Sequence, residues 1–167
     1  MKSNLLRYAD YSIVFQEVPG EISLALNITE CPHGCDGCHS SYLSKSFGNY
    51  VDDDLPNLLR KYEGMISCVC FMGGDQHIGN LYTWLRRIKQ EYHLKTCVYS
   101  GCSDLIVFGE LLEYLDFLKI GPYKRDYGGL DCPTTNQKFY TVDYCTFKYG
   151  QTCKLTCRND LFWKHYD

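Results

Sequence analysis

Strand-like and helix-like segments alternate along the middle of this 167-residue chain. The apolar runs 66–72, 95–99 and 116–120 are short enough to be buried strands, and apolar residues recur at helical spacing between them. A strand–helix–strand succession of this kind builds a parallel sheet whose crossover helices cover its faces. The sequence therefore predicts an α/β fold, in which ligands bind at the carboxyl ends of the strands.

Two further strands are expected before this alternation begins, over 11–18 and 21–28. A Pro19-Gly20 turn separates them, and apolar residues occupy every second position from Ile22 to Ile28. Too few strand–helix units follow for a closed eight-stranded barrel, so we expect a partial barrel in a single domain. The expected helices are 55–62, started by the acidic residues 52–54, then 78–88, and 106–115, capped by Ser103.

The charge and hydropathy of the chain indicate which classes of partner to expect. The net charge is −3 and the sequence pI about 5.9, which provides no basic field for nucleic acid. No apolar run approaches the roughly 18 residues of a membrane span. The first fifteen residues contain no apolar core of an export signal. We therefore expect a cytoplasmic protein without a nucleic-acid or membrane partner.

Eleven cysteines are many for such a chain. In a reducing compartment, clustered cysteines are more typical of metal ligands or catalytic groups than of a disulfide framework. Three of them, Cys31, Cys35 and Cys38, lie within eight residues. Fully ligated cubane clusters normally use four thiolates. Three thiolates would hold three irons and leave the fourth open to the amino and carboxylate groups of a methionine, so the spacing indicates a site-open [4Fe-4S] cluster.

Three other interpretations fit the same nine residues. The segment from Cys35 to His39 matches the C-x-x-C-H attachment site of c-type haem, although that chemistry needs export. A structural zinc site could combine the three cysteines with His33 or His39, although the paired C-x₂-C groups of such sites are missing. Chance clustering in a cysteine-rich chain is the third alternative.

A second motif, Gly73-Gly74-Asp75, directly follows the apolar run 66–72. By itself it fits an ordinary Gly-Gly turn. As part of a site, it would offer a backbone carbonyl and a carboxylate to the ammonium group of a methionine. Glycine would let the backbone approach that ligand closely.

Together these motifs resemble the radical S-adenosylmethionine (SAM) superfamily, and within it the anaerobic ribonucleoside-triphosphate reductase activating proteins. The resemblance covers about residues 13 to 140. The C-x₃-C-x₂-C loop is specific for the superfamily, and Asp75 replaces the glutamate of many members, as is usual in this branch. The segments similar to the branch are FMGGD at 71–75, YSG at 99–101, KIGPY at 119–123 and GGLDCPTTNQ at 128–137, with Gly37 before the third cysteine.

The resemblance implies a partial (β/α)6-like radical SAM barrel as a single core domain over residues 1–144. It also implies the activity: reductive cleavage of SAM and hydrogen abstraction from a backbone glycine of the large reductase subunit. No side-chain general base is required for that step. The implied electron donor is a flavodoxin or ferredoxin. The implied cluster ligands are Cys31, Cys35 and Cys38, and the implied SAM-binding residues are Gly37, Cys38, His39, Gly73, Gly74, Asp75, Ser100 and Lys119.

Two of these SAM-binding residues, Ser100 and Lys119, come from later parts of the chain. Ser100 and Lys119 follow later strands, where they could reach the ribose or the carboxylate. Lys119 also fits a solvated strand end. His77, close after the Gly-Gly-Asp turn, is expected at the edge of the site.

The segment 145–167 is a cysteine-rich tail that the resemblance does not cover. Cys145, Cys153 and Cys157, with Cys132 nearby, could supply thiolates to a second cluster or to zinc. Their C-x₇-C-x₃-C spacing matches no compact pattern, which favours ordinary thiols. Cys68, Cys70 and Cys97 fall within strand-like runs and are expected to be core thiols.

Two other functions remain open from the sequence. One is a small radical SAM enzyme that acts on a small molecule such as a pterin-derived substrate. The other is a zinc- or cluster-binding structural or electron-transfer protein without SAM chemistry, against which the Gly73-Gly74-Asp75 motif argues.

Overall fold

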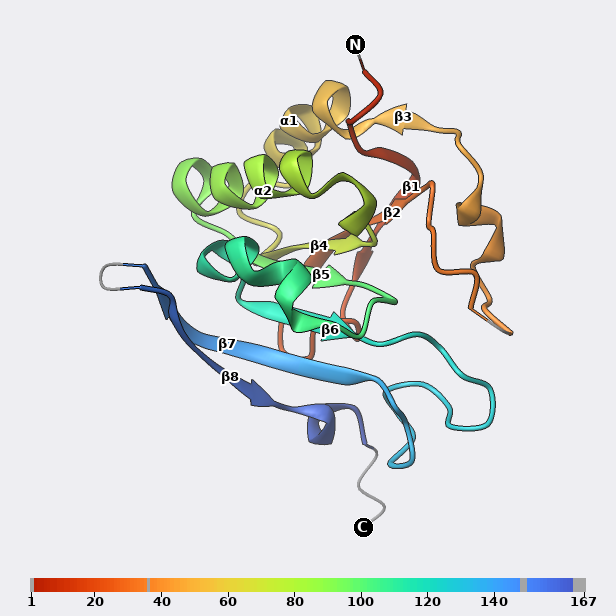
Figure 1. The fold of residues 1–167 in the computed structure, drawn as a ribbon. Coiled ribbons are helices and arrows are strands. Elements are labelled where there is room, and N and C mark those ends of the chain that lie inside the picture. Colours follow the sequence, from red (N-terminus) through yellow and green to blue (C-terminus); the bar gives the residue numbers. More distant parts are fainter. Residues whose placement is uncertain (1, 36, 148–149, 164–167) are drawn as a thin grey trace.

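The chain folds as an α/β structure around one mixed sheet of eight strands (Figure 1). The computed structural model describes residues 2–35, 37–147 and 150–163. The sheet order is β3-β1-β2-β4-β5-β6-β7-β8. The strands are β1 Arg7–Val14, β2 Ser23–Ile28, β3 Asn49–Tyr50, β4 Cys68–Met72, β5 Lys95–Tyr99, β6 Phe117–Ile120, β7 Lys138–Thr146 and β8 Thr152–Cys157. The helical segments are η1 Ser41–Ser44, α1 Val51–Lys61, η2 Asp75–His77, α2 Ile78–Arg87, η3 Ile88–Tyr92, η4 Leu105–Tyr114 and η5 Asn159–Phe162.

The middle of the sheet consists of four parallel strands, which confirms the α/β prediction. β2 pairs with β4, β4 with β5, and β5 with β6, all in parallel. Every residue of β4 except Met72 is fully buried, as expected of a strand covered on both faces. The connections between these strands contain α1, α2 with η3, and η4.

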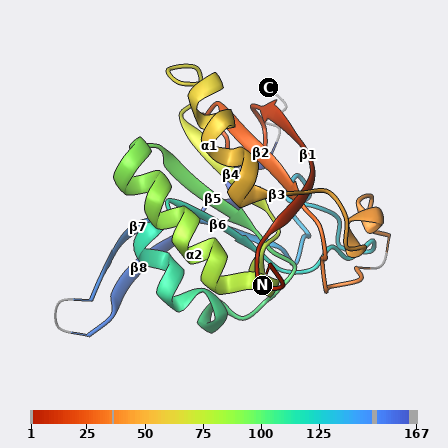
Figure 2. The ribbon, with the colours of Figure 1, turned by 90° about the horizontal axis from the view of Figure 1, so that it is seen from above.

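Helices cover one face of this parallel sheet (Figure 2). The main core lies between them and the strands and includes Phe71, Trp84 and Phe108, all buried. Acidic residues in the first turn of α1 and basic residues in its last turn complement the helix dipole. The indole of Trp84 on α2 donates a hydrogen bond of 2.6 Å to Asp52, which joins the start of α1 to α2.

Antiparallel strands flank the parallel strands on both sides. β1 pairs with β2 and β3 at one side, and β7 pairs with β6 and β8 at the other. The boundary expected between residues 144 and 145 falls inside β7, and β8 completes the sheet. The first half of the cysteine-rich tail is therefore built into the same sheet as the rest of the chain.

The second face of the sheet carries a smaller core of sulfur and aromatic groups. Cys68, Cys70 and Cys97 are fully buried there, which confirms that they are core thiols. The ring of Phe139 packs against Phe117 and Phe162, with ring centres 5.9 and 4.9 Å apart. This packing holds β7 and η5 against β6.

Some expected boundaries differ from the structure. The first strand runs over Arg7–Val14 rather than 11–18, because Val18 leaves the ladder to fill the smaller core. The segment expected as a helix over 106–115 forms 3-10 turns, where β-branched Ile106 and Val107 and then Gly109 disfavour an α-helix. Its cap is the Asp104 side chain, which accepts a hydrogen bond from the Ile106 N–H, and not the expected Ser103.

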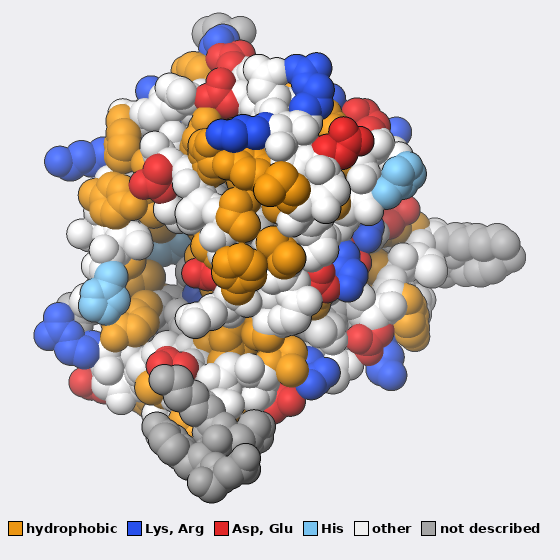
Figure 3. Space-filling model, turned by 180° about the vertical axis from the view of Figure 1, so that it is seen from behind, with side chains coloured by type: hydrophobic (Ala, Val, Ile, Leu, Met, Phe, Trp, Pro, Cys, Tyr) orange, Lys and Arg blue, Asp and Glu red, His pale blue; other side chains and the backbone are white. Residues whose placement is uncertain are grey.

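The surface carries both signs of charge. On the face in Figure 3, acidic and basic side chains are interspersed around a group of hydrophobic side chains. None of the helices within the described ranges is long and apolar enough to cross a membrane.

Candidate functional site

A pocket opens at the carboxyl ends of the parallel strands. Two long connections meet there, the Cys loop (residues 29–48) after β2 and the segment 121–137 after β6, which lie side by side in Figures 1 and 2. Side chains from the ends of all four parallel strands also line it. This is the position that the strand order predicts for a ligand site.

The Cys loop brings its three cysteines to this one pocket. Cys31, Cys35 and Cys38 all line it, and burial raises the pKa of the Cys31 thiol. The Cys38 N–H donates to the Cys35 carbonyl at 3.2 Å, with Gly37 at a φ of +71° between them. A residue with a side chain would be strained at this φ, so the glycine permits the tight turn between two of the cysteines.

The three thiols are partly exposed rather than packed into the core. Among the described residues, no three His, Cys, Asp or Glu side chains converge as the ligands of a single metal ion. Around one zinc, with Zn–S bonds of ~2.3 Å, sulfur ligands lie about 3.8 Å apart. A cubane does not require this closeness, because each thiolate binds a different iron. Three thiols around one pocket fit the donor set of a cluster.

Two imidazole–carboxylate pairs tie the Cys loop to η2. His33 Nε2 lies 2.8 Å from Asp75 Oδ2, and His77 Nε2 lies 2.9 Å from Glu30 Oε2. Each segment therefore contributes one histidine and one acid. His77 thus anchors the loop near the site, and the pKa of the Glu30 carboxyl is lowered by its hydrogen bonds with Ser46 and His77.

The Gly73-Gly74 turn has the backbone conformation that its sequence indicates, with φ angles of +111° and +117°. A Cβ at Gly74 would contact the Leu6 and Leu81 side chains at 3.4 and 3.5 Å, and so would point into the core. Gly73, but not Gly74, lines the pocket. The interpretation that glycine at 74 clears space for a ligand is therefore wrong, because it is the positive φ that requires glycine there.

Asp75 begins η2 with only 8% of its side chain exposed, and it lines the pocket. Its Oδ2 is bonded to His33, on the carboxylate that the sequence predicts to hold a ligand ammonium. His33 in turn packs on Gly101, where a Cβ would lie 2.7 Å from the imidazole Cγ. Gly101 thereby makes room for the histidine of the Cys loop.

Ser100 and Lys119 form the buried floor of the pocket. Ser100 Oγ accepts a hydrogen bond from the Cys102 N–H at 2.9 Å. Lys119 Nζ donates to the carbonyl oxygens of Ser100 and Gly121 at 3.3 and 2.9 Å. Lys119 is only 8% exposed, so its interpretation as a solvated strand end is wrong. Burial lowers the pKa of this amine to about 8, and the nearby cysteines oppose that shift.

The two remaining SAM-site candidates lie toward the outside of the Cys loop. A Cβ at Gly37 would lie 3.0 Å from the Arg125 guanidinium. The exposed His39 ring lies 6.0 Å from the ring of Tyr123. The structure thus places Gly37 and His39 against the segment 121–137, whereas Cys38 faces the pocket.

Other lining residues were not selected from the sequence as site residues. Gln76, Tyr123 and Gln137 all line the pocket. Gln76 directly follows the Gly-Gly-Asp motif, and the other two lie in segments similar to the reductase activating proteins. Their position near recognised motifs was the available signal, but their uncharged side chains suggested no specific chemistry.

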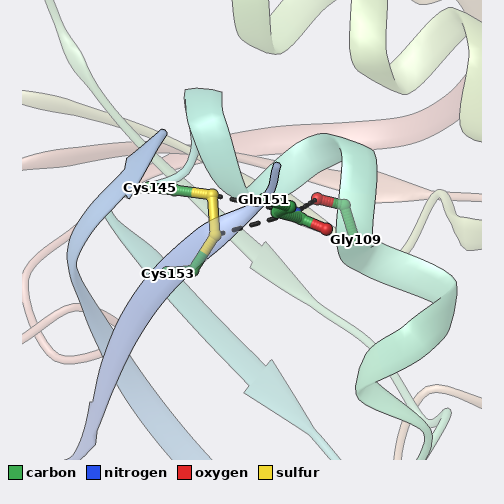
Figure 4. Close-up of a disulfide and its surroundings, with 4 residues drawn as sticks. All are labelled: Gly109, Cys145, Gln151 and Cys153. Atoms are coloured by element: carbon green, nitrogen blue, oxygen red, sulfur yellow. Dashed lines mark hydrogen bonds between the residues drawn. A yellow bond between two sulfur atoms is a disulfide. The ribbon is translucent and has the colours of Figure 1, made fainter. Parts of the chain in front are cut away.

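The tail cysteines do not gather at one place. Cys145 and Cys153 lie opposite each other on β7 and β8 and form a disulfide, with Gln151 linking the pair to Gly109 of η4 (Figure 4). The prediction of ordinary thiols is therefore wrong for this pair, because antiparallel pairing brings them into contact. Cys157 lies four residues further along β8, about 13 Å away at ~3.3 Å per residue. It and Cys132 are free.

Comparison with known proteins adds no relative. No protein-family model, curated protein or solved structure matches the chain.

Proposed function

We propose that this chain is a radical SAM activating enzyme that generates a glycyl radical on the large subunit of an anaerobic ribonucleoside-triphosphate reductase. The observation that carries the proposal is the meeting of Cys31, Cys35 and Cys38 with Asp75 and Lys119 in one pocket. Thiols, a carboxylate and a buried amine at parallel strand ends form a suitable donor set for a site-open cluster and a zwitterionic ligand.

Each group in the pocket has a distinct part in this proposal. Cys31, Cys35 and Cys38 would hold three irons of a [4Fe-4S] cluster. The Asp75 carboxylate would accept hydrogen bonds from the ammonium of SAM. Two of the three N–H donors of the Lys119 ammonium bind backbone carbonyls, so the third would be available for the carboxylate of the ligand. When bound, the cluster and SAM together supply one-electron reductive cleavage of the sulfonium and hydrogen abstraction from the substrate.

The chain's own contribution is to position these groups and to limit access of water. The low exposure of Asp75 and Lys119 strengthens their interactions with an opposite charge. We propose that the parallel strands and their crossovers correspond to a partial (β/α)6-like radical SAM barrel. The electron would come from a flavodoxin or ferredoxin in the cytoplasm.

An exposed apolar run, a few residues after the pocket-lining Ser100 and Gly101, favours a protein substrate. Leu105, Ile106 and Val107 follow the loop after β5 and are 36%, 85% and 41% exposed. Three consecutive exposed apolar residues are unfavourable unless they serve an interaction. This observation favours the activating enzyme over a radical SAM enzyme acting on a small molecule. The gathering of Asp75 and Lys119 around the cysteines similarly favours SAM chemistry over a purely structural zinc or cluster site.

The test is formation of the radical itself. Anaerobically reconstituted protein would be incubated with SAM, dithionite and the large subunit of a candidate anaerobic reductase, and examined by EPR. We expect a glycyl radical signal on the reductase that requires both SAM and the activating chain. SAM cleavage with no radical on the reductase would indicate another radical SAM substrate. No SAM binding or cleavage would contradict the proposal as a whole.

A further inference from the structure

A second hollow adjoins the three cysteines of the Cys loop, which line both it and the pocket at the strand ends. The other described residues that line it are Gly34, Ser40, Ser41 and Ser44. We call it the serine hollow. Among the described residues, no charged side chain lines this hollow, whereas Asp75 and Lys119 line the pocket. A cluster held by the three thiolates would therefore lie beside three serines as well as beside the pocket.

The hydroxyl groups of these three serines are not engaged elsewhere. Ser40, Ser41 and Ser44 are exposed, and their hydroxyls form no hydrogen bond with any other described residue. Ser46, in the same loop, differs, because its hydroxyl donates a hydrogen bond of 2.6 Å to the Glu30 carboxylate. A serine hydroxyl has one O–H donor, which rotates to suit its acceptor. Each of the three serines can therefore donate to a group bound in the hollow.

The backbone holds these serines beside the cysteines. The segment η1 begins and ends with a serine of the hollow. Leu43, inside η1, is buried, and its carbonyl accepts a hydrogen bond of 3.0 Å from the Cys31 N–H. The Ser40 N–H donates to Cys38 Sγ at 3.4 Å. One donor of this segment is thus already directed at a sulfur that the proposed function assigns to the cluster.

We propose that Ser40, Ser41 and Ser44 raise the reduction potential of the cluster by donating hydrogen bonds to its sulfur atoms. This inference rests on the proposed function, in which one electron passes from a reduced flavodoxin or ferredoxin to the oxidised cluster. Hydrogen bonds to the sulfurs are one of the factors that set the potential of an iron–sulfur cluster. The reduced cluster carries one more negative charge than the oxidised cluster, so the donors stabilise the reduced state. The serines supply no iron ligand.

The test is an EPR-monitored redox titration of anaerobically reconstituted protein without SAM. Two triple variants are compared with the wild type: Ser40, Ser41 and Ser44 all changed to Ala, which removes the hydroxyls, and all three changed to Thr, which keeps them. Ser46→Ala is the matched control, because it removes a hydroxyl of the same loop that is bonded to Glu30 instead. Iron analysis and circular dichroism establish that cluster and fold are intact in each protein.

We expect a more negative midpoint potential in the triple alanine variant. At a fixed potential its ratio of reduced to oxidised cluster should fall about tenfold, which corresponds to about 59 mV for one electron. The triple threonine variant and Ser46→Ala should stay within about threefold of the wild type. This pattern depends on the hydroxyl groups and not on the size of the side chains.

The remaining outcomes separate this inference from the proposed function. An unchanged or more positive potential in the triple alanine variant, or equal shifts in the alanine and threonine variants, would overturn the role of the serines and leave the proposed function standing. The expected shifts in a protein that does not cleave SAM would support the role of the serines and contradict the proposed function. Failure of the wild type to bind a cluster would overturn both.

Discussion

His33 Nε2 lies 2.8 Å from Asp75 Oδ2, so the histidine of the Cys loop already occupies the carboxylate assigned to the ligand. The imidazole sits against Gly101, which has no side chain to exclude it. The Cys loop is thus joined to the Gly-Gly-Asp turn by a direct hydrogen bond. In the proposed function, an ammonium that binds Asp75 Oδ2 competes with His33 for this oxygen.

Replacing His33 by Ala should tighten SAM binding to the reconstituted protein. The ligand would no longer compete with the imidazole, and a hydrogen bond of this kind contributes about 0.5–1.5 kcal/mol, or about two- to tenfold in affinity. His77→Ala is a matched control, since it removes the other imidazole–carboxylate pair without freeing Asp75. Titration calorimetry measures both. Weaker binding in His33→Ala than in His77→Ala would show that the His33 bond assists the ligand instead of competing with it.

The two glycines of the turn should be needed for stability. Gly73→Ala and Gly74→Ala would each place a side chain at a φ above +110°, which costs about 1 kcal/mol or more. Gly79→Ala is the matched control, because this glycine lies in the first turn of α2 with open space around its Cβ position and no positive φ. There alanine should leave the stability unchanged or raise it, by about 1 kcal/mol at most. Urea unfolding of the three metal-free variants gives the comparison, and equal free energies of unfolding would refute the strain argument.

These glycines illustrate how far the sequence leads. Gly73-Gly74 after the apolar run predicts a strand end and a turn, and both are present. What a Cβ at Gly74 would contact is not local, since one of its two neighbours, Leu6, is remote in the sequence. Local sequence therefore indicated the conformation, whereas only the packing explains why Gly74 faces the core.

Because of Lys119, the free energy of unfolding of the metal-free protein should increase with pH in the alkaline range. The folded pKa of Lys119 is about 8 against an ordinary value of 10.5, so between these values the unfolded chain binds more protons. The free energy of unfolding then rises with pH over this window. Relative to Lys119→Met, the wild type should gain about 2 kcal/mol between about pH 7.5 and about pH 10.

Urea unfolding of wild type and Lys119→Met at both pH values measures this difference, in which the titration of all other groups largely cancels. If the free energies of unfolding of wild type and Lys119→Met differed by the same amount at both pH values, Lys119 would have an ordinary pKa. It would then not be held in the buried environment described above.

The tail cysteines should not contribute iron ligands. Replacing Cys145, Cys153 and Cys157 together by Ser should leave about four irons per chain, as expected of a single cubane cluster. Two of the three are paired with each other, and the third lies about 13 Å along the strand at ~3.3 Å per residue. Iron and zinc analysis of reconstituted protein decides this. A loss of about four irons, or of one zinc, would reveal a second site.

The fold was more predictable than the pocket. Apolar runs located β4, β5 and β6, because buried parallel strands need continuous hydrophobicity. The pairing of β7 with β8 was not predicted, since it depends on contacts across the sheet rather than on a local pattern. The same holds for the hydrogen bond from Gln76 to the Thr29 carbonyl, which joins residues 47 positions apart in the sequence.

The central claim is that Cys31, Cys35 and Cys38 hold a cluster that cleaves SAM. The most direct measurement is 5′-deoxyadenosine formation by anaerobically reconstituted protein with SAM and dithionite, in wild type, Cys35→Ala and Cys97→Ala. Cys97 is a fully buried core thiol and serves as the matched control. We predict product from the wild type, product within a few-fold of it from Cys97→Ala, and none from Cys35→Ala. Product from Cys35→Ala, or its absence from reconstituted wild type, would contradict the claim.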